Sequence, residues 1–132
     1  MVIETKLMDQ LEQEQLFNEA LIRMTVLLYQ IDGKVTLTEQ DYLSNLVENI
    51  PWRSGVVLPA FISQAIHESR QAIDTQQSSQ YLRAIGKDLN IDPARAFEVA
   101  MEITEVDGKR SEEELELLSL LSNRILGRGL VA

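Results

Sequence analysis

Apolar residues recur at steps of three and four along most of the chain, and strict alternation over strand-like lengths is hard to find. Three- and four-residue steps line up apolar side chains on one face of an α-helix, whereas alternation indicates a half-buried strand. The pattern therefore predicts an all-α protein. We expect helices at about residues 9–32, 37–50, 59–74, 81–89, 93–106 and 112–126.

Proline, aspartate and glycine mark several helix boundaries. Pro59 suits the first turn of the third expected helix, and Asp92-Pro93 combines an N-cap residue with proline at the first helical position. Gly127 and Gly129 are expected to end the last helix. No low-complexity linker divides the 132 residues, so we predict a single-domain bundle, residues 1–132, of about six to seven helices.

Part of the sequence repeats at an offset of 75 residues (107 − 32). Asp32-Gly33-Lys34 returns as Asp107-Gly108-Lys109, between amphipathic segments in both places. We expect two helix–turn–helix repeats, at about 16–50 and 92–127, related by a pseudo-two-fold axis, with intervening helices at about 57–90. The matching pairs continue as Thr36 and Ser111, Glu39 and Glu114, Leu43 and Leu118, Leu46 and Leu121, and Ile50 and Ile125.

Helix capping explains most of the repeated residues. Gly33 and Gly108 stand where a left-handed residue commonly ends a helix. The segments 36–39 and 111–114 read Thr-x-x-Glu and Ser-x-x-Glu, the pattern of a capping box, and such caps contribute about 1 kcal/mol each. This explanation needs no ligand, but it leaves the repeated aspartates unexplained.

Asp32 and Asp107 each fall at a helix C-terminus, where the helix dipole disfavours negative charge by roughly 0.3–1 kcal/mol. Two such residues at equivalent places indicate either inheritance alone or a shared use. The shared use would be a cation site between the two turns, formed by Asp32 and Asp107 with nearby carboxylates and waters. Because the chain has no cysteine and one histidine, the ligands would be mostly oxygen, and the cofactor would be a divalent cation such as Ca²⁺, Mg²⁺ or Mn²⁺.

Composition removes several other functions. The chain has no cysteine, which excludes thiolate metal sites and cysteine nucleophiles, and it has one histidine, His67. Twelve basic and 21 acidic residues give a net charge of −9, which disfavours nucleic acid and anionic membrane as partners. The first residues lack the pattern of a signal peptide, and the apolar stretch 21–31 is too short to span a membrane. We expect a soluble, cytoplasmic domain.

Two further features suit a protein partner. The segment 98–116 holds eight acidic residues against Lys109 and Arg110, so its net charge of −6 could attract a cation or a basic protein surface, or simply solvate a helix face. Trp52-Arg53 lies in a loop bounded by prolines, where Trp52 either contacts a partner or packs into the core. No phosphate-binding loop or nucleophile elbow is present.

The paired Asp-Gly-Lys-x-[Ser/Thr]-x-x-Glu turns in an acidic, all-α chain resemble the TerB-like family of tellurite-resistance proteins. The resemblance extends from about residue 16 to 126. It implies a helical fold with pseudo-two-fold repeats, a divalent-cation site at these turns, a stress-response role and no catalytic activity. Arg110 departs from the pattern, since the first copy has Val35. The motif positions are Asp32, Gly33, Glu39, Asp107, Gly108 and Glu114.

Two functions follow from these observations. The first is a non-enzymatic TerB-like domain that binds a divalent cation at its acidic turns and works through protein partners. The alternative is a metal-free interaction or scaffold module, in which the turns serve only as caps and the acidic helix or the Trp52 loop docks a partner. The sequence leaves the oligomeric state open.

Overall fold

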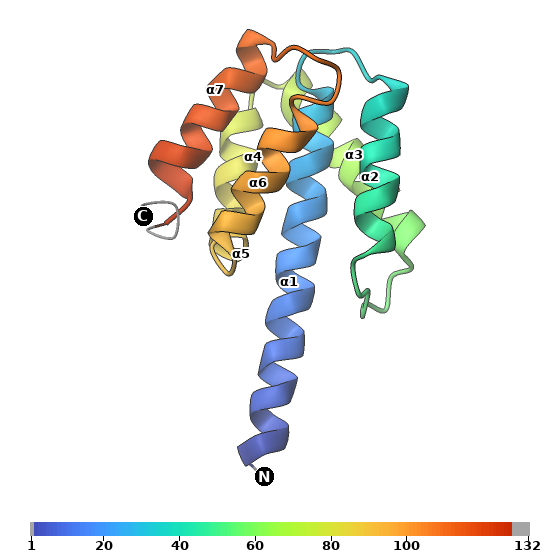
Figure 1. Ribbon diagram of the computed structural model, residues 1–132, viewed down its shortest axis with the longest axis vertical. Helices are drawn as coiled ribbons and strands as arrows, with labels where there is room; N and C mark the ends of the chain where they lie inside the picture. The colour runs from blue at the N-terminus through green and yellow to red at the C-terminus, as the bar shows by residue number, and fades with distance from the viewer. Residues whose placement is uncertain (1, 128–132) are drawn as a thin grey trace.

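The computed structural model describes residues 2–127, and every regular element in that range is helical (Figure 1). The all-α prediction is therefore confirmed, with seven α-helices and a final π-helical turn. The elements are α1 (Val2–Gln30), α2 (Leu37–Glu48), α3 (Leu58–Asp74), α4 (Ser78–Ala84), α5 (Gly86–Leu89), α6 (Pro93–Ile103), α7 (Glu112–Leu120) and η1 (Leu121–Ile125).

The C-terminal half of α1 is the centre of the bundle. Helices α2, α3, α5 and α6 all contact it, and α3 makes the most extensive contact. From Phe17 to Gln30 nearly every side chain of α1 is buried, because neighbours cover the helix on all sides. The largest fully buried apolar side chains are Leu21, Ile22, Met24, Leu27, Leu28, Leu82, Leu89, Ile103 and Leu121.

The N-terminal half of α1 projects beyond the other helices, at the lower end of Figure 1. The helix begins at Val2, earlier than the expected residue 9, and residues 6–10 are all exposed. The apolar pattern missed this extension because it detects only the part of a helix that packs against a core. Within residues 2–127, no helix combines the length and apolarity that a membrane crossing requires.

The chain after α3 is more broken than expected. The expected helix 81–89 is split into α4 and α5, and the expected helix 112–126 changes to π-helical geometry at Leu121. A Cβ on Gly86 would approach Ile125 Cγ2 to 2.7 Å, so glycine permits the close packing of α5 against η1. Asn90 joins the same elements, since its amide donates to the Ile125 carbonyl at 2.7 Å. Gly129 lies outside the described residues.

Both predicted helix–turn–helix hairpins form, one from α1 and α2 and the other from α6 and α7. Figure 1 shows their connecting loops at the same end of the bundle. Thr36 and Ser111 are the N-cap residues of α2 and α7, and each forms the predicted capping box with a glutamate three residues later. Asp92 caps α6, also as expected.

Replacing either N-cap hydroxyl should destabilise the fold. We expect Thr36→Ala and Ser111→Ala each to lower the free energy of unfolding by about 1 kcal/mol, because the third helical amide loses its acceptor. Urea denaturation followed by circular dichroism measures the effect. Thr38→Ala, at an exposed position inside α2, is the matched control and should leave stability nearly unchanged. Equal effects of Thr36→Ala and Thr38→Ala would contradict the capping role.

Candidate functional site

The two Asp-Gly turns have the same backbone geometry. Gly33 has φ +78° and Gly108 has φ +94°, a left-handed conformation that glycine adopts without steric cost. The amide of Gly33 donates to the Gln30 carbonyl at 3.0 Å, and the amide of Gly108 donates to the Glu105 carbonyl at 2.9 Å. The two helices end earlier than expected, at Gln30 and Ile103, so each glycine lies in the turn after its helix and redirects the chain toward the next one.

The structure gives the two aspartates a role that capping alone did not. Asp32 Oδ1 accepts a hydrogen bond from the backbone amide of Lys34 at 3.0 Å. Asp107 Oδ1 is placed in the same way toward the amide of Lys109, at 3.4 Å. An aspartate that bonds the backbone two residues on stabilises a tight turn. Asp32 and Asp107 lie beyond the last residues of α1 and α6, Gln30 and Ile103, so this bond gives each aspartate a structural role in its turn.

The two glutamates are the most unusual groups at the turns. Glu39 and Glu114 are fully buried. One carboxylate oxygen of each completes a capping box: Glu39 Oε1 accepts from the Thr36 amide at 2.8 Å, and Glu114 Oε1 accepts from the Ser111 amide at 2.7 Å. The other oxygen, Oε2, has no hydrogen-bond partner in either residue, and these are the only two such buried side-chain atoms among the described residues.

Burial and nearby negative charge both favour the protonated form of these glutamates. Burial raises the pKa of the Glu39 carboxyl above its ordinary value, hydrogen bonds from Thr36 oppose the change, and the charges of Asp107 and Asp32 raise the pKa further. The pKa of Glu114 is raised by the same causes, with Ser111 as the opposing donor. The charges of both aspartates act on both glutamates, so Asp32, Glu39, Asp107 and Glu114 share one electrostatic environment, which we call the acidic site.

Tyr29 belongs to the same region, although the sequence analysis did not select it. Its side chain is buried at the end of α1, and burial together with the negative charge of Glu39 raises the pKa of the phenol. The only sequence signal was a polar-tipped aromatic within an apolar stripe, just before Asp32.

Arg110 makes the second turn different from the first. Its guanidinium donates to the hydroxyl of buried Thr104 and to the Met101 carbonyl, both at 2.9 Å, and pairs with Glu105 at 3.3 Å. A cation at the C-terminal end of α6 also complements the helix dipole. Val35, the equivalent residue of the first turn, is 41% exposed. The second turn is therefore tied to α6 by a side chain that the first turn lacks.

The acidic face of α6 does not add free ligands to the turns. Glu98 pairs with Arg95, Glu102 accepts a hydrogen bond from the Tyr42 hydroxyl of α2, and Glu105 pairs with Arg110. These contacts fix the carboxylates on the bundle surface. Over residues 2–127, no three His, Cys, Asp or Glu side chains are grouped closely enough to hold a metal ion by themselves. A cation at the turns would keep water among its ligands.

Trp52 takes the packing role rather than presenting a free indole. Its ring lies 4.9 Å from that of Phe61, and its indole N–H donates to the Val56 carbonyl at 2.8 Å. His67 is exposed on α3. The contacts of Trp52 with Phe61 and Val56 do not involve the acidic turns.

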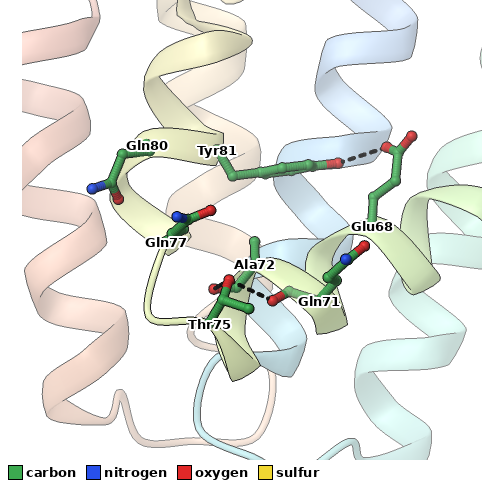
Figure 2. A pocket seen from close by; sticks show the side chains of 7 residues that line it. All are labelled: Glu68, Gln71, Ala72, Thr75, Gln77, Gln80 and Tyr81. Carbon is green, nitrogen blue, oxygen red and sulfur yellow. Dashed lines mark hydrogen bonds between the residues drawn. The ribbon is translucent and has the colours of Figure 1, made fainter.

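A separate cavity of about 460 Å³ lies between the end of α3 and the start of α4 (Figure 2). Its polar groups are mostly engaged or neutral: the Tyr81 hydroxyl donates to the Glu68 carboxylate at 3.2 Å, and the Thr75 hydroxyl donates to the Gln71 carbonyl at 2.8 Å. These contacts are local to α3 and α4, and none of the cavity's lining residues belongs to the acidic turns.

Comparisons with protein-family models, with curated proteins and with solved structures found no match to the chain.

The raised pKa values predict how stability depends on pH. A carboxyl with a higher pKa in the folded state binds its proton more tightly there than in the unfolded chain. The stabilisation that this tighter proton binding gives to the folded state is complete below the ordinary glutamate pKa, and it is lost as the pH rises through the folded-state pKa. We expect Glu39→Gln/Glu114→Gln, which keeps the capping acceptors, to remove this loss. Chemical denaturation of both proteins from about pH 4 to about pH 8 measures the difference.

The control for this experiment is Glu48→Gln/Glu116→Gln, which removes the same two charges from exposed positions of α2 and α7. Its stability should follow the pH dependence of the unaltered protein in the range above the ordinary glutamate pKa. The assignment is wrong if the control pair flattens the profile as much as the buried pair does.

Proposed function

We propose that this protein is a non-enzymatic, TerB-like domain that binds a divalent cation weakly at its two Asp-Gly turns and acts through protein partners. The observation that carries the proposal is the pair of buried, unbonded Oε2 atoms of Glu39 and Glu114. They occupy equivalent positions in the two repeats, so each repeat has a buried carboxylate oxygen that no donor or cation contacts.

A buried anionic oxygen without a hydrogen bond is costly, and either a proton or a metal ion can remove the cost. The charges of Asp32 and Asp107 raise the proton affinity of both glutamates, and the same charges would attract a cation. The four carboxylates supply only oxygen ligands, which suit Ca²⁺, Mg²⁺ or Mn²⁺. Since no three acidic side chains of residues 2–127 lie close enough to hold an ion by themselves, at most two of these carboxylates would bind it directly, and water would complete its coordination.

The resemblance to TerB-like proteins supports the wider role. It implies a stress-response function associated with tellurite resistance and no established catalytic activity, which fits a role exerted through protein partners. The absence of cysteine and the surface position of His67 limit any metal chemistry to oxygen ligands. Cation binding would then link the occupancy of the turns to the stability of the two hairpins.

The second candidate is a metal-free interaction module. It is favoured by the bonds from Asp32 to Lys34 and from Asp107 to Lys109, which give both aspartates a structural use without a ligand. In that case protonation alone compensates Glu39 and Glu114, and the charge of the aspartates serves no further purpose.

Metal titration separates the two candidates. We expect Ca²⁺ to shift, and paramagnetic Mn²⁺ to broaden, the amide NMR signals of residues 30–39 and 105–114. A concentration ten times Kd should raise the free energy of unfolding by about 1.4 kcal/mol. Asp32→Asn/Asp107→Asn should abolish both effects. Asparagine keeps the oxygen that accepts the turn amide, so this variant removes charge while preserving the turn.

The matched control is Asp9→Asn/Asp41→Asn, which makes the same change at two exposed positions outside the turns. It should bind the ion as the unaltered protein does. If millimolar Ca²⁺ produces no signal shifts and Mn²⁺ no broadening, or if the control pair loses binding equally, the cation site does not exist and the interaction module becomes the better account.

A further inference from the structure

The projecting half of α1 carries a groove between two rows of side chains. One row contains Met8, Glu12 and Leu16, and the other contains Leu11 and Gln15; residues within each row are four apart. Together with Arg53 they line a cavity of about 410 Å³. A channel between two such rows has the shape that receives a ridge of side chains from another helix. The geometry thus selects a helix as the occupant.

The apolar side chains of this arm are left open to solvent. Leu7 is 54% exposed, Met8 59% and Leu16 44%. They lie together on a helix segment that extends past the bundle (Figure 1). A segment of this length gains little helical stability from its own hydrogen bonds in water and normally needs packing against another element. A partner that covers the groove would supply that packing.

The upper end of the groove is fixed in place. The backbone amide of Arg53 donates to Gln15 Oε1 at 2.8 Å, and its guanidinium pairs with Glu14 at 3.2 Å. The loop after α2 is therefore held against α1. The groove keeps a defined shape at this end, so that a partner meets a surface that is already formed.

The negative charge of the groove favours a partner helix that carries basic side chains. Glu12 is exposed in the middle of its row and forms no ion pair with any residue between 2 and 127, whereas Glu14 is already neutralised by Arg53. The chain as a whole carries a net charge of −9. A lysine or arginine beside the apolar ridge of an incoming helix would pair with Glu12 and be drawn by the overall field.

We propose that this groove docks a cationic amphipathic helix of a partner protein, with its apolar ridge between Met8 and Leu11 and a basic side chain at Glu12. The proposal deepens the partner role given above and is independent of cation binding. A second copy of the chain fits less well, because it would bring another unpaired Glu12 and another net charge of −9 to the same surface.

The test uses a labelled amphipathic peptide of about 18 residues made of leucine and lysine, and a matching peptide of leucine and glutamate. Fluorescence anisotropy measures Kd against the full chain. We expect the lysine peptide to bind and the glutamate peptide not to bind. Met8→Asp should weaken binding roughly tenfold, because it places a charge in the apolar groove. Glu12→Gln should weaken binding less and reduce its dependence on salt.

Leu115→Asp is the matched control, since Leu115 is 51% exposed on α7 and the change adds the same charge. General attraction between a basic peptide and an acidic protein would make both aspartate variants bind more tightly, whereas docking in the groove weakens Met8→Asp alone. Equal or tighter binding by Met8→Asp therefore overturns the proposal. So does a dimer in sedimentation that Met8→Asp dissociates, because a second copy would then occupy the groove.

The two proposals fail separately. Met8 lies on the projecting arm, far along α1 from Asp32, so Met8→Asp should leave the metal titration unchanged. Loss of peptide binding in Asp32→Asn/Asp107→Asn would show instead that the peptide binds at the turns, and would contradict the groove.

Discussion

Glu39 and Glu114 each use one carboxylate oxygen to begin a helix and hold the other in the interior without a hydrogen bond. The first use is structural, because the capping boxes set where α2 and α7 start and so how each hairpin closes. The second use leaves an energetic cost at the centre of the acidic site. Protonation removes that cost, and the proposed cation would remove it in the same way.

The rest of the bundle holds these two carboxylates near the same pair of aspartates. The buried half of α1 runs through the middle of the fold and contacts α2 and α6, so the two hairpins are joined through one helix. The hydrogen bond between Tyr42 and Glu102 links α2 directly to α6. Each glutamate consequently experiences the charge of its own turn and that of the other turn. The repeated sequence thus produces a shared electrostatic site.

Periodicity and capping residues were enough to predict the helical class, both Asp-Gly turns and both capping boxes. They could not reveal the unbonded Oε2 atoms, since the burial of Glu39 depends on packing between elements distant in the chain. The backbone bonds of Asp32 and Asp107 were also missed, although aspartate is common in such turns. The projecting arm of α1 was not predicted, because an uncovered helix need not show a core-facing apolar stripe. The contacts of Arg110 were not predicted either, because they depend on where α6 lies in the fold.

The most direct test is to follow the side-chain carboxyl ¹³C signals of Glu39 and Glu114 from about pH 3 to about pH 8, with and without millimolar Ca²⁺. Without metal, both carboxyls should titrate above the ordinary glutamate value, and Ca²⁺ should lower both pKa values because the bound ion replaces the proton. Titration at the ordinary value in metal-free protein, or raised values that Ca²⁺ leaves unchanged, would contradict the account.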